Sequence, residues 1–570
     1  MKKYLLLLFA VSIFWQVFSQ PIIIKNVTLI DVKTGKAIPA QSIVIKGERI
    51  ETIAAAKKIK EPTGAVIIDG TGKFLMPGMI DAHIHFFQSG GLYTRPDAVD
   101  LRKITPYEKE KEFGLNNASD YMRRYLRLGI TSVIDVGGPF SNFTIRDSIA
   151  KTTVAPNIFV TGPLFSIIED DYFGADKPIE KIASEKEADA LFAKMLPYKP
   201  DFIKIWYIAD AANPAEKNFP LVKYIAEQTY KHGLKLTVHA TELETAELAV
   251  KAGADILVHS VFDKIIPPEF IKTLVAKKVT YIPTLIVVDN YPKSLSGRLP
   301  HHPQDLAWAN AFAYGSLSDP EAMDSATMPP VLKMLRKTDI PATGNKGDSV
   351  SAINLVNLVR AGVNVAAGTD AGNIGTMHAS SFIQELEAMQ NAGLTNAEII
   401  KTSTINAAIG FGKERQWGSI EKGKMADLVL LDKNPLESLQ NLNAINTIFK
   451  NGKRLRPDTI VAETAEAVVQ RQLNAYNARN IDAFLDGYAD DIEIYDFHSN
   501  QPEKGKEIMR KNYGEMFKQT PNLYCAIEKR IVIGNKVIDE EKVRAGNKTI
   551  HAVAVYEVEN GKIKRVTFMQ

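Results

Sequence analysis

Between residues 78 and 413, short apolar runs of strand-like composition alternate with amphipathic helical segments. Helix-like stretches separate the runs, and several of them end in glycine, as a helix C-cap would. Strands that alternate with helices form parallel sheets, so eight repeats predict an α/β fold, a (β/α)8 TIM barrel. A doubly wound open sheet is the competing architecture. The eight runs are MIDAHIHF, ITSVIDVGG, NIFVTGP, FIKIWY, KLTVHA, DILVHS, TYIPTL and NVAAGTDAG.

Two β-patterned segments flank the predicted barrel. Residues 20–77 contain strand-like runs broken by turn residues, and residues 414–457 return to the same pattern. Neither half alone offers enough strands to bury one face of a sheet. We therefore expect the halves to combine into one composite β-sandwich domain. The longest insertion in the barrel, residues 286–350, follows the seventh run and could act as a lid.

The tail, residues 458–570, has a third pattern. Helical segments come first, and then long strands separated by the turn signals GN at 534–535, AGN at 545–547 and NG at 560–561. This order predicts a separate α+β domain of cone-like shape, with helices packed on a curved antiparallel sheet.

The first nineteen residues predict export. Lys2 and Lys3 precede an apolar run from Tyr4 to Phe18, and small Ser19 stands at a plausible cleavage position. This is the pattern of a signal peptide over residues 1–19, and the run is shorter than the ~20 residues that a membrane anchor needs. We expect a periplasmic or extracellular protein without a stable membrane anchor after cleavage.

Composition and charge narrow the function classes. Apolar residues make up 45% and charged residues 24% of the chain, as in globular proteins. The 69 basic residues nearly balance the 66 acidic ones, so no electrostatic feature favours nucleic acid or a membrane surface as a partner. Cys525 is the only cysteine, which excludes an internal disulfide.

Several residues that could bind a metal stand at the ends of the predicted strands. His83 and His85 share one face of the first strand, because side chains alternate along a strand. Such a pair can ligate one metal ion, although a His-x-His pair on its own more often consists of two polar surface residues. Active sites of barrels form at the carboxyl ends of the strands. Further ionisable residues stand at those ends in later runs, namely Lys204, His239, His259 and Asp370.

The motifs PGMIDAHIH, TVHAT, ILVHS, AAGTDAG and GSIEKGKMADLVLLD resemble those of the metal-dependent amidohydrolase superfamily, in its imidazolonepropionase-like and prolidase-like branches. The resemblance covers about residues 22–457. It implies a barrel with a mono- or binuclear metal centre at its mouth. His83, His85 and Asp370 would hold one divalent ion, and His239 and His259 a second. Lys204 would bridge the two ions as a carbamate.

The function implied is hydrolysis of a C–N bond in an amide, a cyclic amide or a peptide-like small molecule. Two zinc ions would activate a hydroxide, with Asp370 as the proton shuttle and His259 as the second catalytic residue. His378, Tyr207 and Glu242 are expected to contact the substrate. The regions KIWYIADAANP and GPLFSIIEDDYFGADKP lack the glycine-rich stretches of prolidase-like relatives, which puts dipeptidase specificity in doubt.

Glu242 supports an alternative. It lies three residues after His239, as an acid does in mononuclear deaminases and imidazolonepropionase-like enzymes. If only one metal binds and Lys204 is unmodified, deamination or ring opening becomes the expected reaction.

The tail motifs resemble the SnoaL-like branch of the nuclear transport factor 2 fold, which implies a conical apolar pocket. They are QLNAYNARNIDAFLDGYADDIEIYDF, GKEIMRKNYGEMF and VYEVENGKIKRVTF. Asp496, His498 and Tyr513 could face this pocket. Ligand binding or pairing with a second copy of the chain is the expected role. A non-catalytic periplasmic ligand-binding protein that uses this pocket is the alternative outside the enzymes.

Overall fold

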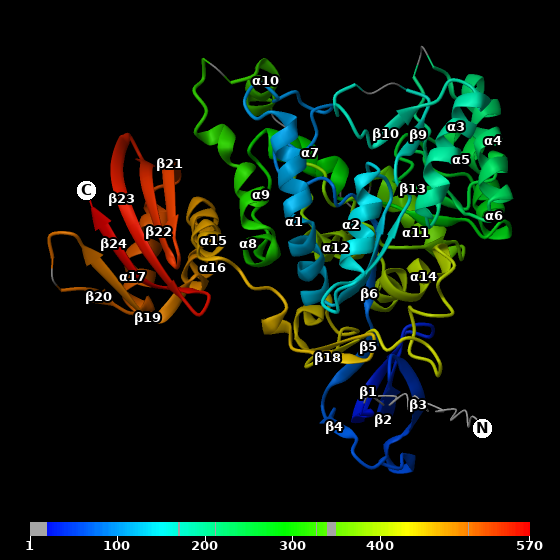
Figure 1. The fold of residues 1–570 in the computed structure, drawn as a ribbon, viewed down its shortest axis with the longest axis horizontal. Helices are drawn as coiled ribbons and strands as arrows, with labels where there is room; N and C mark the ends of the chain where they lie inside the picture. Colours follow the sequence, from blue (N-terminus) through cyan, green and yellow to red (C-terminus); the bar gives the residue numbers. More distant parts are fainter. Residues whose placement is uncertain are drawn as a thin grey trace, which may run out of the picture.

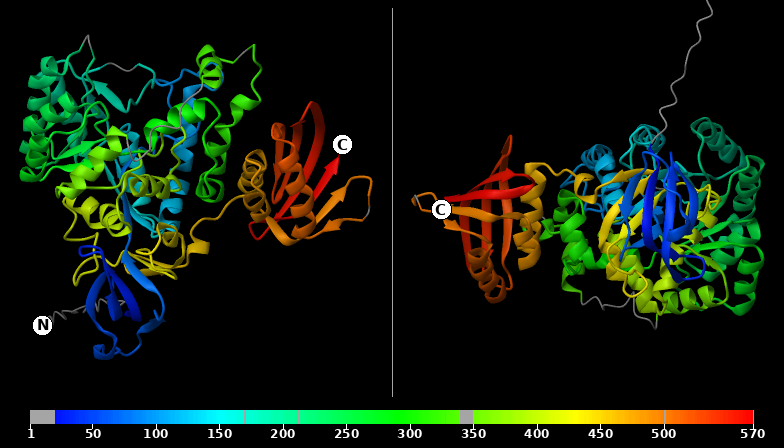
Figure 2. Two further views of the ribbon diagram at one scale, coloured as in Figure 1. Left: turned by 180° about the vertical axis from the view of Figure 1, so that it is seen from behind. Right: turned by 90° about the horizontal axis from the view of Figure 1, so that it is seen from below.

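The computed structural model describes residues 20–168, 171–210, 213–326, 328–338, 349–499 and 501–569. The predicted signal peptide, residues 1–19, lies outside the described residues and stays a prediction. Figure 1 shows a β-rich region at the N-terminal end, a large central region of strands and helices, and a C-terminal lobe beside it. The lobe stays at the side of the central region in both views of Figure 2.

One eight-stranded sheet combines the segments from both sides of the central region. Its order is β18-β17-β16-β5-β1-β2-β3, with β4 against β1. Strand β5 joins the two halves, because it pairs parallel with β1 and antiparallel with β16. The strands are β1 (Ile22–Asp31), β2 (Lys36–Lys46), β3 (Arg49–Ala55), β4 (Val66–Asp69), β5 (Phe74–Pro77), β16 (Leu428–Leu431), β17 (Ile445–Lys450) and β18 (Lys453–Leu455).

The central region is built on parallel strands, and each of the eight predicted runs holds one. They form two sheets, β6-β7-β8 and β10-β9-β11-β12-β13-β14-β15. Apart from β10 and β9, the strands follow each other in sequence order, without the reversal of a doubly wound sheet. The strands are β6 (Met79–Ile84), β7 (Ile130–Asp135), β8 (Asn157–Val160), β9 (Leu164–Ser166), β10 (Ile179–Lys181), β11 (Ile203–Trp206), β12 (Leu236–His239), β13 (Ile256–Val258), β14 (Thr280–Ile282) and β15 (Asn364–Val365).

Backbone hydrogen bonds connect the two parallel sheets at both edges. At one edge, the N–H of Ala82 donates to the carbonyl of Ala367 (2.9 Å) and the N–H of Asp370 to that of His83 (2.7 Å). At the other edge, the N–H of Asp201 donates to the carbonyl of Val160 (2.9 Å). The edge of β6 is therefore covered by the chain that follows β15.

Helices surround these strands, and their buried faces are made of apolar residues in the largest core cluster. The long helix α1 contacts β7 and buries Tyr121, Met122 and Tyr125 in the largest core cluster. A π-helical stretch, Thr402–Asn406, continues α13. The helices are α1 (Tyr107–Arg127), α2 (Ser141–Ile149), α3 (Glu185–Met195), α4 (Ala215–Lys231), α5 (Leu243–Ala252), α6 (Pro268–Ala276), α11 (Val350–Arg360), α12 (Ser381–Ala392), α13 (Asn396–Lys401) and α14 (Ala407–Gly410).

The predicted insertion contains helices of its own. Two of them, residues 303–308 and 311–316, pack between the barrel region and the C-terminal lobe, because Leu306, Ala313 and Tyr314 share one apolar cluster with Val468 and Val469 of the lobe. Residues 327 and 339–348 of the insertion lie outside the described part, so the lid prediction stays untested. The helices are α7 (Val287–Leu295), α8 (Pro303–Trp308), α9 (Ala311–Ser316) and α10 (Pro330–Lys337).

The C-terminal lobe is an α+β unit with one six-stranded sheet in the order β20-β19-β24-β23-β22-β21. Strands β19 and β24 pair in parallel, and the other neighbours are antiparallel. Its elements are α15 (Ala465–Asn477), α16 (Ile481–Asp486), β19 (Tyr488–Asp496), β20 (Glu503–Lys504), α17 (Lys506–Gln519), β21 (Tyr524–Ile533), β22 (Lys536–Ala545), β23 (Lys548–Glu559) and β24 (Lys562–Met569).

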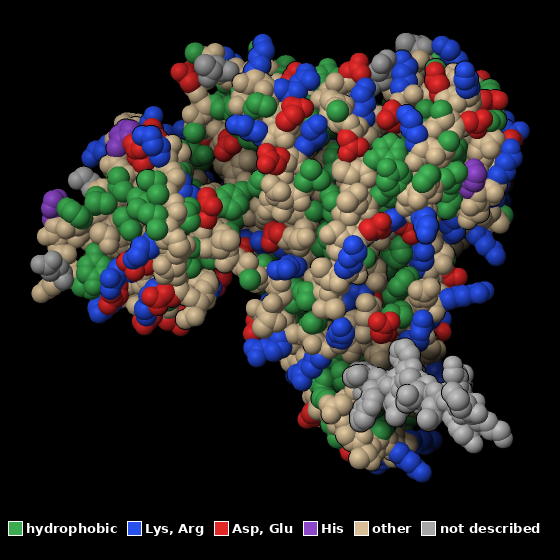
Figure 3. Space-filling model, viewed as in Figure 1, with side chains coloured by type: hydrophobic (Ala, Val, Ile, Leu, Met, Phe, Trp, Pro, Cys, Tyr) green, Lys and Arg blue, Asp and Glu red, His purple; other side chains and the backbone are tan. Residues whose placement is uncertain are grey.

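Basic and acidic side chains are interspersed over the face shown in Figure 3, without a large patch of one sign. Hydrophobic side chains gather on the C-terminal lobe in the same view. In this lobe, Phe497, Ile531 and Ile533 are among the most exposed apolar residues. Among the described residues, no helix is both long enough and apolar enough to cross a bilayer.

Candidate metal and substrate site

The predicted metal ligands come together at the carboxyl ends of the parallel strands. His83 lies in β6 and His85 one residue beyond it, while Lys204 lies in β11 and His239 ends β12. His259 follows β13 directly. In a sheet of parallel strands the carboxyl ends share one edge, so residues far apart in the sequence meet there.

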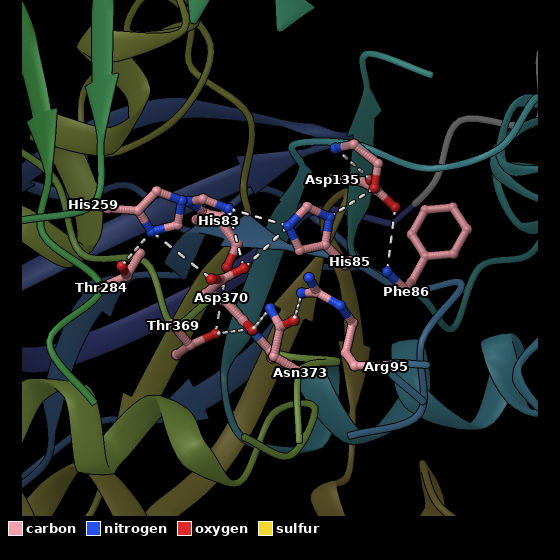
Figure 4. Close-up of polar contacts among 12 residues, drawn as sticks. His83, His85, Phe86, Arg95, Asp135, His259, Thr284, Thr369, Asp370 and Asn373 are labelled. Atoms are coloured by element: carbon pink, nitrogen blue, oxygen red, sulfur yellow. Dashed lines mark hydrogen bonds and ion pairs between the residues drawn. The ribbon is translucent and has the colours of Figure 1, made fainter. Parts of the chain in front are cut away.

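His83, His85 and Asp370 form the tightest group (Figure 4). Asp370 Oδ1 lies 3.2 Å from His83 Nε2 and 3.0 Å from His85 Nε2. The two Nε2 atoms are 3.3 Å apart. All three ligand atoms lie within 4.8 Å of one another. Three lone-pair donors that converge on one point fit a bound cation.

His259 and His239 extend this group. His259 Nδ1 lies 3.8 Å from Asp370 Oδ2 and contacts the hydroxyl of Thr284 at 2.8 Å. The rings of His239 and His259 have their centroids 4.3 Å apart. His259 and Asp370 both have left-handed backbone conformations, with φ of 75° and 61°. Residues other than glycine rarely adopt this conformation, and it is concentrated at functional sites.

Buried carboxylates hold the ligands in place. Asp81 accepts hydrogen bonds from the N–H and the hydroxyl of Thr369, at 3.0 and 2.7 Å, and so ties β6 to the turn that carries Asp370. Burial raises the pKa of Asp81 to about 7. The carbonyl of Gly137 contacts His85 Nδ1 at 2.7 Å, which turns Nε2 of this ring toward Asp370. Such outer partners orient metal ligands.

Three histidines of the group are neutral at physiological pH. Burial lowers the pKa of His83 to about 4 and those of His239 and His259 well below the usual value. Burial would raise the pKa of Asp370, but His83 and His85 lower it well below its usual range. Neutral imidazole and ionised carboxylate are the forms that bind metal ions.

Lys204 is 2% exposed and has no hydrogen bond or ion pair to another described residue. Burial lowers the pKa of its ammonium to about 7, so a share of the side chain is a neutral amine near neutral pH. An ammonium cannot bind a cation, whereas a carbamate on this nitrogen would supply oxygen ligands.

Five of the six predicted ligands line one cavity of about 310 Å³. Most of its wall is apolar. The cavity is lined by the ligands His85, Lys204, His239, His259 and Asp370 and by the apolar residues Phe87, Leu164, Phe173, Ile179, Trp206, Phe262, Val287 and Val288.

The three predicted substrate contacts lie elsewhere. Tyr207 is buried, and its hydroxyl donates to the carbonyl of Ala215 at 2.6 Å. His378 is buried against Tyr121, and its Nε2 contacts the carbonyl of Gln88 at 2.8 Å. Glu242 is the N-cap residue of α5. None of the three lines the cavity.

A loop arginine that the sequence patterns did not single out lines the cavity instead. Arg95 donates to the side-chain oxygen of Asn373 (Figure 4). It also donates to the hydroxyl of Tyr291 at 2.8 Å and to the carboxylate of Asp97 at 2.7 Å. Arg95, Tyr291 and Asn373 all face the cavity. They come from loops and an insertion helix, where no strand or helix period marks a buried position, so periodicity could not identify them.

Comparison with known proteins follows this division of the chain. The model of the amidohydrolase family matches residues 74–455, and the model of the SnoaL-like domain matches residues 469–566. The family match covers more than half of the chain.

Curated relatives and solved structures agree with that match. The chain is 25% identical to an imidazolonepropionase of Shouchella clausii over 72% of the chain and 84% of the relative. It is 21% identical to a 5-methylthioadenosine/S-adenosylhomocysteine deaminase of Carboxydothermus hydrogenoformans over 81% of the chain and 95% of the relative. The crystal structure of a Xaa-Pro dipeptidase with bound methionine superposes with a TM-score of 0.58 at 21% identity, covering 77% of this chain and all of that one.

Proposed function

This chain belongs to the amidohydrolase family, and we therefore propose that it is an exported, metal-dependent hydrolase of a carbon–nitrogen bond in a small amide, cyclic amide or peptide-like substrate. The observation that carries the proposal is the convergence of His83, His85 and Asp370 on one point at the base of a cavity. The amino-terminal pattern of Lys2, Lys3 and the following apolar run supports export.

For the fold we propose a closed (β/α)8 barrel with the composite sheet attached and a cone-like C-terminal domain. The hydrogen bonds from Asp370 to His83 and from Asp201 to Val160 support closure, since they join β6 to the chain after β15 and β8 to the segment before β11. The domain boundaries that we propose are residues 20–77 with 414–457, residues 78–413 and residues 458–570.

The residues present fit two divalent cations, with zinc as the first choice. His83, His85 and Asp370 would hold one, and His239 and His259 the other, with Lys204 between them as a carbamate. The fit rests on converging lone pairs, on neutral imidazoles and on a buried lysine without an ion-pair partner among the described residues. When bound, such ions lower the pKa of water and polarise a substrate carbonyl.

Residues of the protein would transfer the proton from the attacking water to the leaving nitrogen. Asp370 is anionic and accessible from the cavity, so it can accept the proton of the attacking water and donate it to the leaving nitrogen. His259 would be the second catalytic residue: its Nδ1 lies 3.8 Å from the second oxygen of Asp370 and contacts the hydroxyl of Thr284 at 2.8 Å.

The cavity wall indicates the substrate class. Phe87, Leu164, Phe173 and Trp206 form apolar walls beside the ligand group. Burial of such surface contributes ~25 cal/mol for each Å² of apolar area. We therefore propose an amide that carries an aromatic or branched aliphatic group next to the bond that is cleaved.

A mononuclear deaminase or imidazolonepropionase-like ring hydrolase is the second candidate. Two observations favour it: the similarity to an imidazolonepropionase and a deaminase, and the fact that the tightest ligand group in the described residues has three members. Glu242, which would act in that reaction, lies outside the cavity lining.

The experiment that tests the proposal combines metal analysis with a substrate screen. Protein purified with zinc is expected to contain close to two ions per chain and to hydrolyse members of a panel of N-acyl amino acids, dipeptides, lactams and hydantoins. The double variant His83→Ala, His85→Ala should lose metal and reduce kcat/KM by at least about a thousandfold.

The matched control replaces the exposed His551, which lies in the C-terminal lobe, by alanine. This variant should keep both metal content and activity. If the double variant keeps its metal and every hydrolytic activity unchanged, His83 and His85 do not form a catalytic metal site, and the ligand-binding alternative gains support. One ion per chain with activity only on ring or amino substrates would favour the second candidate.

A further inference from the structure

The C-terminal lobe contains a second cavity, of about 380 Å³, between its helices and the inner face of its sheet. Aromatic rings form much of the wall. Phe484 lies at the centre of this group, with ring centroids 4.7 Å from Tyr513, 5.1 Å from Tyr488 and 6.0 Å from Tyr476. The described residues that line the cavity include Glu541 and Glu503, but no lysine, arginine or histidine.

Glu541 is a buried acidic residue of this cavity, and only one of its carboxylate oxygens accepts a hydrogen bond from a described side chain. It is 7% exposed and projects from β22 on the same side as Val543 and Ala545, which also line the cavity. The hydroxyl of Tyr556 donates to its Oε1 at 2.8 Å. The described residues offer Oε2 no hydrogen bond and no ion pair.

The neighbouring acidic residue on the same face of β22 does have a basic partner. Asp539 is 1% exposed, and Arg530 donates to both of its oxygens at 2.7 Å. Two residues further along β22, Glu541 has no basic partner of this kind. An unpaired carboxylate inside a protein is costly, and burial accordingly raises the pKa of Glu541 to about 7.

A bound cation would supply the missing partner. Ammonium groups form charge-assisted hydrogen bonds with carboxylates, and the faces of aromatic rings attract cations. An anionic ligand would instead meet two carboxylates and no basic residue in the lining. The cavity volume suits a ligand of modest size, because small-molecule sites span about 300–1,000 Å³.

We propose that the cavity of the C-terminal lobe binds a small organic amine with an aromatic or alicyclic body. Its ammonium group pairs with Glu541, and its apolar body packs among Tyr476, Phe484 and Tyr513. This site is separate from the cavity that contains His85 and Asp370, since the two cavities share no lining residue.

Three probes of similar size and different charge test this inference on the full chain at pH 7.5: 2-phenylethylamine, neutral 2-phenylethanol and anionic 3-phenylpropanoate. Calorimetric titration should show the amine binding about tenfold or more tightly than the alcohol, with no measurable binding of the acid. Glu541→Gln should remove the preference for the amine. Glu540→Gln is the matched control, because Glu540 precedes it in β22 and instead pairs with Lys529.

Two further variants locate the binding and guard against misfolding. His83→Ala with His85→Ala should bind the amine as the unchanged chain does, which separates this site from the catalytic cavity. Tyr513→Leu keeps Glu541 but removes one aromatic wall, and it should weaken amine binding about threefold to tenfold. The inference is wrong if no amine binding occurs, if the alcohol binds as tightly as the amine, or if Glu541→Gln, shown to be folded by circular dichroism, binds the amine unchanged.

Discussion

At the scale of single residues, Lys204 decides between one metal and two. It is buried as the second residue of the four-residue strand β11 and lines the same cavity as the ligand group. We expect Lys204→Ala to bind about one ion fewer per chain and to lose at least about a hundredfold in kcat, because the proposed carbamate bridge could not form. Metal analysis and steady-state kinetics measure both effects, and intact mass should show the carbamate on the unchanged protein.

Lys450 provides the control for this substitution. It is similarly buried but pairs with Asp427 at 2.9 Å, away from the cavity. Lys450→Ala should lower stability and leave the number of bound ions unchanged. Full activity of Lys204→Ala with two bound ions would rule out the bridging role.

Glu541 predicts a pH dependence of stability. Its folded-state pKa of about 7 lies above the usual value of about 4.3, so the folded lobe binds the proton more tightly than the unfolded chain does. The stability of the lobe should therefore fall as the pH rises from about 4 to 7. The loss is on the order of 3 kcal/mol in the absence of a ligand.

Glu541→Gln should remove this loss, because an amide does not titrate and can still accept the hydrogen bond from Tyr556. Thermal unfolding at pH 5 and pH 8 measures the effect, and the variant should gain relative stability at pH 8. Glu540→Gln, which changes a residue paired with Lys529, should follow the unchanged protein. The same loss at pH 8 in Glu541→Gln would contradict the assignment.

At the scale of elements, the turn after β15 positions Asp370 against β6. Gly372 lies in this turn with φ of 105°, and a Cβ atom there would lie 2.3 Å from the carbonyl oxygen of His85. Gly372→Ala should therefore displace the turn and weaken metal binding about tenfold or more, as measured by competition with a chelator.

Gly362 is the control that separates the effect of backbone strain from the effect of a steric clash with the added Cβ atom. It has a similar φ of 87°, but a Cβ atom at this position would meet no atom of the described residues within 4 Å. Gly362→Ala should cost about 1 kcal/mol of stability through backbone strain and leave metal affinity unchanged. Equal metal affinity in both alanine variants would show that the turn does not set the geometry of the site.

Single elements also show how much of the structure the sequence patterns predict. Each of the eight apolar runs holds a strand, because alternation between buried strands and helices is a local property that composition reveals. The last run contains a strand of two residues only, Asn364–Val365, and Asp370 lies in the turn beyond it. Sequence patterns do not predict the helices of the insertion one by one, because these helices are short and their buried sides depend on contacts with the C-terminal lobe.

At the scale of the whole molecule, Glu463 joins the lobe to the barrel region. It accepts hydrogen bonds from Arg124 of α1 and Arg471 of α15, each at 2.9 Å, and both arginines also donate to the carbonyl of Ala309. Burial alone would raise the pKa of Glu463, but these arginines lower it to about 2. Stability from this group is therefore present above about pH 4.5 and is lost in stronger acid.

Glu463→Gln should weaken the contact between lobe and barrel by about 2 kcal/mol, because two largely buried guanidinium groups lose their counter-ion. Limited proteolysis should cut the connection before α15 faster in the variant. Glu466→Gln, in the first turn of the same helix, is the control and should leave the cleavage rate unchanged. Unchanged proteolysis of Glu463→Gln would show that apolar packing alone holds the lobe in place.

Pairing of two copies through the C-terminal lobe stays a proposal at this scale. The strand β21 lies at the edge of its sheet and exposes Ile531 and Ile533. An edge strand with exposed apolar side chains is a site where another chain can add. Light scattering of the full chain should report a dimer if this proposal is right.

Patterns along the chain are sufficient to predict the parallel α/β centre, the α+β tail and the strand-end positions of the candidate metal ligands. Side-chain parity and strand–helix alternation are local properties, and parallel strands bring their carboxyl ends to one edge. Which side chains enter the cavities follows only from the three-dimensional packing. Tyr207 and His378 turn into the core, while Arg95 and Glu541 face cavities, because burial depends on contacts between distant segments.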